Sequence, residues 1–280
     1  MSTQLSGPDP DVARHAGWQQ PQPRKGFFTD TSICIGCKAC EVACKEWNGV
    51  PDDGFNLLGS SFDNTGELGA STWRHVAFIE QRDDRGDFRW LMESDVCKHC
   101  THAACLDVCP TGALFRTEFG TVVVQDDICN GCGYCVPACP FGVIDRRVGE
   151  KGTKNVGLAQ KCTLCYDRLH DGMTPACAQA CPTESIQFGD LDELRERAAA
   201  RLSALHDAGV GDARLYGHDP NDGIGGAGAM FLLLDEPEVY GLPPDPVVTT
   251  RDLPTMWKRA GIAALTFALG ALASFAGRNA

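Results

Sequence analysis

The sequence predicts an α+β fold made of two cysteine-rich domains, a C-terminal extension and a single C-terminal helix. Two short runs, Leu-Phe-Arg at 114–116 and Thr-Val-Val-Val at 121–124, are typical of two strands joined by a turn through Gly120. Leucines at roughly helical spacing follow residue 190, and residues 260–277 form 18 consecutive positions without a charge. With 280 residues, 43% of them hydrophobic, the chain is long enough to bury a core.

The sixteen cysteines of the chain divide without remainder into four groups of four. The groups are Cys34, Cys37, Cys40 and Cys44; Cys97, Cys100, Cys105 and Cys109; Cys129, Cys132, Cys135 and Cys139; and Cys162, Cys165, Cys177 and Cys181. The first and third groups have the spacing C-x2-C-x2-C-x3-C. The middle gap widens to four residues in the second group and to eleven in the fourth. Proline follows the last cysteine in every group except the first, where Lys45 stands.

This spacing is that of bacterial ferredoxins, in which thiolates hold iron–sulfur cubanes. Three cysteines on a tight loop can reach three irons of one cubane, and the fourth, further along the chain, ligates the neighbouring cluster. Such motifs therefore work in pairs. Four motifs predict two ferredoxin-like domains and four 4Fe–4S clusters.

Other uses of the cysteines fit the pattern less well. Cysteines two residues apart are a poor disulfide framework, and a four-cysteine zinc site usually joins two separated C-x2-C pairs. A mixture of three cubanes and one altered cluster is disfavoured because all four groups are complete. The net charge of −12 argues against a nucleic-acid partner, which needs a basic surface.

The second and third groups form one predicted domain, residues 90–148. It would contain the two strands around Gly120, a short helix near residues 134–138 and a returning strand at 141–144. The first and fourth groups would form the other domain, from residues 26–89 and 149–189, including a strand at 72–81. Residues 1–25 are polar and proline-containing, lack an apolar or twin-arginine signal, and are predicted to be an extended arm.

Residues 190–255 are predicted to be a helix followed by a cap segment. Asp190 and Glu193 have the spacing of a capping box, and Gly209 can end the helix. The glycines between 223 and 228 are interpreted as a turn before an apolar strand, because no Walker lysine follows them.

Residues 256–280 are predicted to be a transmembrane anchor. The 18 uncharged residues would span about 27 Å as a helix, close to the roughly 30 Å of a hydrocarbon core. Trp257, Lys258 and Arg259 lie at one end and Arg278 at the other, as interfacial anchors do. Gly270 and Ser274 form a small-xxx-small pair that can pack on another membrane helix.

Some polar residues beside the cysteines have a possible role in tuning the clusters. Lys38, Lys98 and Lys161 each neighbour a cysteine and could raise a local reduction potential, or could be ordinary solvated or paired lysines. His99 and His102 lie inside the second group, but its four cysteines make them unnecessary as ligands. No arrangement of residues indicates a substrate-converting active site, so the catalytic residues are predicted to be in a partner.

The chain resembles the iron–sulfur (beta) subunits of membrane-bound formate dehydrogenases, within the four-cluster electron-transfer subunits of molybdopterin oxidoreductases. The resemblance is carried by residues 34–48, 131–135, 161–165, 175–177 and 181–183, and extends over the segment 216–243 and the single C-terminal helix. It covers about residues 27–280. Related nitrate, sulfoxide, polysulfide and hydrogenase complexes use similar subunits, so the motifs indicate four clusters more strongly than they indicate formate.

The resemblance implies a ligand set for each cluster. The sets are Cys34, Cys37, Cys40 and Cys181 for the first cluster; Cys44, Cys162, Cys165 and Cys177 for the second; Cys97, Cys100, Cys105 and Cys139 for the third; and Cys109, Cys129, Cys132 and Cys135 for the fourth.

The resemblance also implies the partners. A catalytic alpha subunit with a molybdenum or tungsten pterin would oxidise formate, and a membrane cytochrome or quinone-reducing subunit would receive the electrons. The chain would be anchored in the membrane lipid by one pass. The resemblance implies that the soluble part faces outward, whereas the positive charges at 258–259 favour the cytoplasmic side by the positive-inside rule. The sequence therefore leaves open on which side of the membrane the soluble part lies. The alternatives are the same relay in another molybdoenzyme or a hydrogenase, and a non-redox protein held together by zinc.

Overall fold

A four-stranded sheet in the order β8-β1-β10-β9 lies at the centre of the fold. The structure, a computed structural model, describes residues 12–276 except 53, 55, 56, 60, 83–85, 87 and 151. The strands are β1 (Lys25–Asp30), β8 (Ile186–Asp190), β9 (Arg214–Tyr216) and β10 (Ala229–Leu233). β1 runs parallel to β10 and antiparallel to β8, and β9 is antiparallel to β10. The sheet thus joins both ends of the cysteine-containing region to the C-terminal extension.

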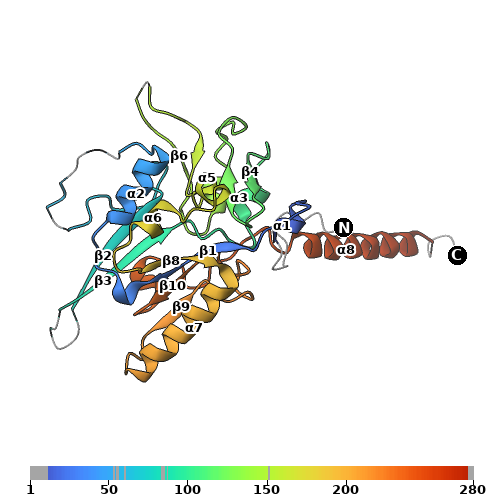
Figure 1. Cartoon of the computed structure of the whole chain (residues 1–280). Coiled ribbons are helices and arrows are strands. Elements are labelled where there is room, and N and C mark those ends of the chain that lie inside the picture. The colour runs from blue at the N-terminus through green and yellow to red at the C-terminus, as the bar shows by residue number, and fades with distance from the viewer. Residues whose placement is uncertain are drawn as a thin grey trace.

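Both faces of this sheet are buried because side chains alternate along its strands. Phe28, Met230 and Leu232 pack against helix α7 (Leu191–Asp207) on one face. Phe27 and Phe231 belong to the cluster of apolar side chains on the other face, which includes several cysteines. Figure 1 shows α7 on one side of the sheet, and α2 and α6 with the cysteine motifs on the other. The sheet is therefore the platform on which the cysteine motifs are assembled.

The cysteine motifs are built from short elements. The helices are α2 (Ala39–Asn48), α3 (Ala104–Asp107), α4 (Cys135–Ala138), α5 (Tyr166–His170) and α6 (Ala176–Gln179). The strand pairs are β2 (Arg74–Arg82) with β3 (Phe88–Val96), β4 (Leu114–Arg116) with β5 (Val122–Val124), and β6 (Asp145–Arg146) with β7 (Ala159–Gln160). Two 3₁₀ turns, Thr31–Ile33 and Pro237–Tyr240, complete the secondary structure.

Several predicted elements are present. The strands around Gly120 are β4 and β5, the helix near 134–138 is α4, and the strand at 72–81 is β2. Helix α7 ends where Gly209 predicts, because Gly209 and Val210 donate backbone hydrogen bonds to His206 and Leu205 in the pattern of a Schellman motif.

Two local predictions are wrong. Residues 141–144 do not form a strand, since Gly142 takes a positive φ of 64° in a turn, and the pairing starts one residue later in β6. The capping box is also absent: Asp190 makes no side-chain cap, and its carboxylate instead pairs with Lys25 on the neighbouring strand. The first difference has a local cause, the turn at Gly142, whereas the second arises because the neighbouring strand offers Asp190 an ion-pair partner.

The N-terminal segment that the structure describes lies on the chain itself rather than extending away. Residues 12–15 form the short helix α1, in which Val12 and Ala13 are buried. Trp18 Nε1 donates a hydrogen bond of 2.8 Å to the carbonyl of Arg116 in β4. Residues 1–11 of the predicted arm lie outside the described residues.

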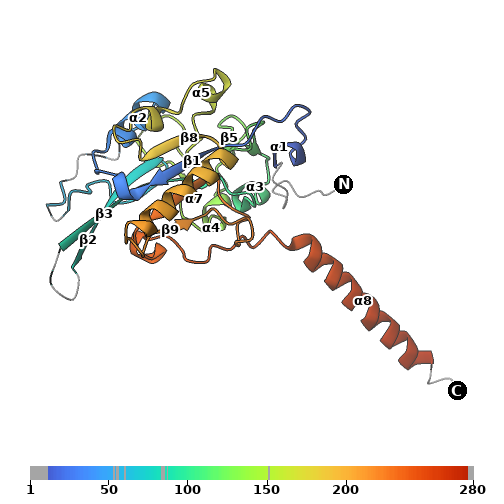
Figure 2. The same cartoon turned by 60° about the horizontal axis from the view of Figure 1, so that its bottom comes forward.

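The C-terminal helix α8 (Leu253–Ala276) projects from the body without packing on it. Figure 2 shows it leaving the molecule as a separate rod. Residues Thr255–Phe275 are long and apolar enough to cross a membrane, and none of the apolar stretch is buried in the chain. The predicted helix is therefore present, and its apolar surface has no partner within the described part of the chain.

A pair of facing glycines provides a test of the central sheet. Gly26 in β1 lies opposite Gly189 in β8. A Cβ on Gly26 would collide with the carbonyl oxygen of Gly228 and lie 2.8 Å from Leu191 Cδ1, whereas one on Gly189 would meet nothing nearer than Leu194, at 3.9 Å. We expect Gly26→Ala to cost about 1–3 kcal/mol and to lower the temperature of cluster loss by several degrees.

Gly189→Ala is the matched control, measured at the same heating rate by visible absorbance. It should leave that temperature nearly unchanged. Equal behaviour of the two variants would show that the close contact between β1 and the loop before β10 does not matter for stability.

Candidate iron–sulfur sites

Four cysteines from two distant motifs line one cavity of about 290 Å³, its open mouth included. Cys34 and Cys37 come from the loop before α2, Cys40 from its first turn, and Cys181 follows α6. Gly36 and Lys38 turn this loop with positive φ angles of 64° and 57°. A Cβ on Gly36 would lie 2.7 Å from Phe78 of β2, so only glycine lets the loop pack this closely on the hairpin.

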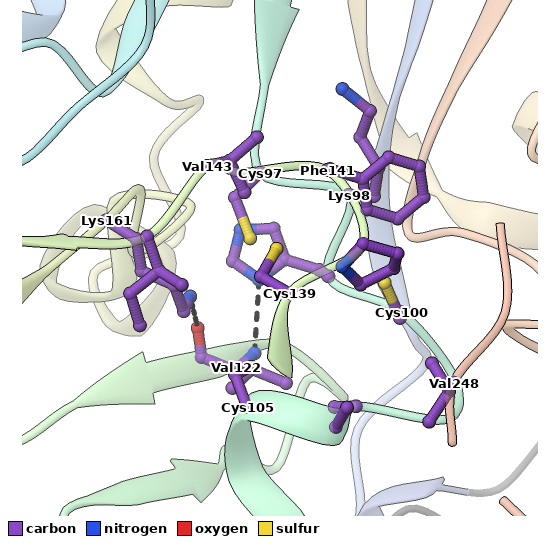
Figure 3. Close-up of a pocket in the computed structure, with 15 residues that line it drawn as sticks. Cys97, Lys98, Cys100, Cys105, Val122, Cys139, Phe141, Val143, Lys161 and Val248 are labelled. Carbon is purple, nitrogen blue, oxygen red and sulfur yellow. Dashed lines mark hydrogen bonds between the residues drawn. The ribbon is translucent and has the colours of Figure 1, made fainter. Parts of the chain in front are cut away.

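A second cavity, of about 390 Å³ with its mouth, has the same construction. Cys97, Cys100 and Cys105 of the second group meet Cys139 of the third group there, as Figure 3 shows. Apolar side chains including Val122, Phe141 and Val143 complete the lining. Thiolate sulfur in a largely apolar cavity is the environment that iron–sulfur clusters occupy, so the residues fit such a group.

The remaining cysteines form two further groups of neighbours. Cys44 on α2 is surrounded by Cys162, Cys165 and Cys177, whose charges, after burial, raise its pKa well above the usual value. Asn48 Nδ2 lies 3.8 Å from Cys44 Sγ and 3.9 Å from Cys165 Sγ, and so bridges the two motifs. The last group comprises Cys135 with Cys129, Cys109 and Cys132, which add to the burial that raises the pKa of Cys135 to about 11.

Most of the cysteines are held as thiols unless iron binds them. Burial raises the pKa of Cys40 to about 11 and of Cys162 to about 12. Coordination to iron removes the thiol proton outright. Cluster insertion therefore converts a set of buried neutral thiols into anions, which creates a need for nearby positive charge.

The groups form a row with two exposed ends. Cys37 is exposed at one end and Cys132 at the other, whereas Cys44 and Cys97 are buried between them. Cysteines of neighbouring groups raise one another's pKa. Cys177 adds to the raised pKa of Cys40, which links the first and second groups of neighbours. Cys97 adds to that of Cys162, and Cys135 to that of Cys105, which link the second to the third and the third to the fourth.

The three lysines beside the cysteines differ in environment. Lys98 and Lys161 are buried, and both line the second cavity. Lys98 pairs with Asp95 and lies 5.1 Å from the centre of the Phe141 ring, while Lys161 donates hydrogen bonds to the carbonyls of Val122 and Cys162. Lys38 is partly exposed and pairs with Glu41 at 3.2 Å and Asp63 at 3.1 Å. The interpretation as solvated or paired surface lysines is therefore wrong for Lys98 and Lys161 as to their exposure, because both are buried, although Lys98 is paired.

The histidines of the second group have structural surroundings. His99 Nδ1 accepts a hydrogen bond of 3.1 Å from the amide of Val122. Burial, followed by the charges of nearby Lys161 and arginines, holds the pKa of His99 well below its usual range, so the ring is neutral. His102 packs under the glycine-rich turn, where a Cβ on Gly225 would lie 2.5 Å from its ring. That turn is thus a close-packed lid over the second motif rather than a phosphate loop.

Sequence reasoning missed several polar residues that contact the cysteine groups. Asn48 bridges two cysteines, Ser94 Oγ lies 3.3 Å from Cys40 Sγ, and Arg74 is buried beside the first and fourth cysteine motifs. Asn48 ends the motif segment 34–48, but its contact with two sulfurs was not predicted. Ser94 and Arg74 belong to no motif, and their positions depend on the pairing of β2 with β3, which brings Arg74 opposite Val96.

The arrangement of the sulfurs favours clusters over single metal ions. Among the residues that the structure describes, no three His, Cys, Asp or Glu side chains converge tightly enough to hold one metal ion. A zinc site needs all of its ligands at about 2.0–2.3 Å from one ion, whereas a cubane attaches each cysteine to a different iron.

Two models of a 4Fe–4S dicluster domain match the chain, one over residues 33–113 and the other over 88–191. The fold and the sites thus define an electron-transfer protein that carries four 4Fe–4S clusters.

Relatives identify the family. The chain is 39% identical over 252 residues to the iron–sulfur subunit of the nitrate-inducible formate dehydrogenase of Escherichia coli K12, covering 89% of this chain and 81% of the relative. It is 40% identical over 250 residues to a formate dehydrogenase iron–sulfur subunit of Haemophilus influenzae, covering 87% and 76%. A subunit of the anaerobic dimethyl sulfoxide reductase of E. coli K12 is 37% identical over 186 residues, covering 65% and 83%. The chain belongs to the family of formate dehydrogenase iron–sulfur subunits, and its role is electron transfer without catalysis of its own.

Proposed function

We propose that the chain relays electrons from a molybdenum- or tungsten-pterin subunit that oxidises formate to a membrane cytochrome or quinone-reducing subunit. The observation that carries this proposal is the row of four cysteine groups between exposed Cys37 and exposed Cys132. When bound, each cluster supplies a one-electron redox site. The protein positions these sites, excludes water from the inner ones and offers one approach at each end.

We propose the four crossed ligand sets given above for the first to fourth clusters. The two cavities support the first and third sets, because each is lined by three cysteines of one motif and one of another. The mutual influence of Cys44 with Cys162, Cys165 and Cys177 supports the second set. The influence of Cys109, Cys129 and Cys132 on the pKa of Cys135 supports the fourth ligand set.

The proposed domains follow from these sets. Residues 26–89 with 149–189 would hold the first two clusters, and residues 90–148 the other two, with 1–25 as arm, 190–255 as helix and cap, and 256–280 as anchor. The boundary at residue 90 falls inside β3, so the hairpin of β2 and β3 physically joins the two domains. The cap contributes β9 and β10 to the central sheet.

We further propose that α8 crosses the membrane once. Its 24 residues give about 36 Å of helix, enough for a hydrocarbon core. The segment before α8 is tied to the second motif, since Thr250 Oγ1 donates a hydrogen bond of 2.6 Å to Asp107 and Val248 lines the second cavity. The anchor is therefore closer to the third and fourth clusters. The fourth cluster would pass electrons to the membrane partner, and the first would receive them from the catalytic subunit.

The same relay in another molybdoenzyme is the second candidate function. The identity with a subunit of a dimethyl sulfoxide reductase favours it, although that match covers only 65% of this chain. In a hydrogenase or reductase complex the clusters would be the same and only the catalytic partner would differ.

Formate itself tests the proposed function. In the complex purified anaerobically in mild detergent, formate should bleach the visible absorbance of the clusters within the turnover time. Dithionite gives the full bleach as a reference. Failure of formate to bleach clusters that dithionite reduces would reject a formate-oxidising partner and favour the second candidate.

Neighbouring cysteines in one motif test the ligand sets. The crossed sets assign Cys177 to the second cluster and Cys181 to the first. We therefore expect Cys181→Ser to alter the same EPR signal as Cys37→Ser, and Cys177→Ser to alter the same signal as Cys162→Ser. If instead Cys177→Ser and Cys181→Ser alter one and the same signal, each motif holds its own cluster and the crossed sets are wrong.

A further inference from the structure

Arg74 is a buried arginine beside cysteines of the proposed first and second ligand sets. Arg74 begins strand β2 and is only 1% exposed. Its Nη1 donates hydrogen bonds to the carbonyl of Ser94, at 3.1 Å, and to Ser94 Oγ, at 3.0 Å. Its guanidinium lies 4.8 Å from the centre of the Phe27 ring. One corner of the guanidinium is thus fixed by β3, and one flat face by an aromatic ring of the central sheet.

The rest of the guanidinium has no nitrogen or oxygen partner in the described part of the protein. Nε and Nη2 are buried without a hydrogen bond. The strongest charge influences on Arg74 come from cysteines of the proposed first and second ligand sets. Ser94 Oγ, which accepts a hydrogen bond from Arg74, also lies 3.3 Å from Cys40 Sγ. The cysteines whose charges act most strongly on Arg74 are Cys177, Cys40, Cys162 and Cys44. In the proposed ligand sets, Cys40 belongs to the first cluster, and Cys44, Cys162 and Cys177 belong to the second.

A buried charge without a counter-charge is strongly unfavourable. No carboxylate in the described part of the chain forms an ion pair with Arg74, and the four strongest charge influences on it are cysteines. A cubane with its four thiolates is an anion, and reduction adds one more electron to it. The two clusters would therefore supply the negative charge that Arg74 otherwise lacks, and the interaction is little screened because the site is buried.

We propose that Arg74 is an electrostatic bridge between the first and second clusters, which stabilises the reduced form of both and so raises both reduction potentials. This inference rests on the ligand sets of the proposed function and adds a positioning residue to them. The step is the one-electron reduction of either cluster: the electron enters the cluster, and Arg74 neither gains nor loses a proton.

Lys38 provides a matched comparison beside the same clusters. It lines the first cavity, as the cysteines of the first set do, but it is partly exposed and already pairs with two carboxylates. Because Lys38 is partly exposed, solvent screens its charge more than that of the buried Arg74. Removing this charge should therefore have a much smaller effect than removing that of Arg74.

The test is an EPR-monitored redox titration of the intact complex with chemical mediators, alongside iron analysis. In Arg74→Gln we expect full iron content and an approximately tenfold or greater fall in the reduced-to-oxidised ratio of the first and second clusters at fixed potential. For a one-electron couple, tenfold corresponds to about 59 mV. In Arg74→Gln the ratio for the third and fourth clusters should change by less than about threefold. In Lys38→Met the ratio for all four clusters should do the same.

Unchanged potentials of the first two clusters in an iron-replete Arg74→Gln, or an equal shift of all four, would overturn the proposal. If Arg74→Gln loses iron, Arg74→Lys decides, because it keeps the charge. In Arg74→Lys, full iron content and reduced-to-oxidised ratios within about threefold of the parent support the bridge. Loss of iron, or a tenfold fall in the reduced-to-oxidised ratio of the first two clusters, overturns it. Because mediators set the potential, failure here is distinct from failure of the formate experiment, and the cysteine variants identify the signals independently.

Discussion

Each cubane needs four thiolates at one place, and in this chain the cysteines that meet are far apart in sequence. Cys181 shares a cavity with Cys34, Cys37 and Cys40, and Cys139 shares one with Cys97, Cys100 and Cys105. The chain between the first and fourth motifs must therefore fold back, so that the fourth motif lies beside the first. The closed arrangement buries thiols whose raised pKa values favour the neutral form, so iron and the polypeptide fold depend on each other.

The central sheet makes this return possible. β1 precedes the first motif and pairs with β8, which follows the fourth, so the two motifs are held side by side by backbone hydrogen bonds. β10 adds the C-terminal extension to the same sheet, and the turn before β10 packs on the second motif through Gly225 and Gly228. One sheet thus holds the cluster domains together and directs the chain towards α8.

Spacing rules predict the chemistry of this chain better than its architecture. The four cysteine groups, the strands around Gly120, the end of α7 and the apolar C-terminal helix all follow from local patterns. The central sheet does not, because β1 and β10 are separated by about two hundred residues and neither carries a turn signal that relates them. Asp190 shows the same limit locally: its sequence context predicts a cap, but the strand beside it offers Lys25.

The polar residues around the clusters lie at the limit of sequence reasoning. Lysines next to cysteines can be picked out, but whether they are buried depends on packing, which separates Lys161 from Lys38. Arg74 lies more than twenty residues from the nearest cysteine in sequence and reaches the sulfurs only through the pairing of β2 with β3. Charges of this kind become visible only once the fold is known.

The proposed relay requires that the four clusters act in series across the fold. The most direct test removes an inner cluster with Cys97→Ser and follows the remaining clusters by freeze-quench EPR after formate is added. Electron transfer in series predicts that the first and second clusters are reduced at the parent rate while the fourth stays oxidised. Reduction of the fourth cluster as fast as in the parent complex would contradict the account.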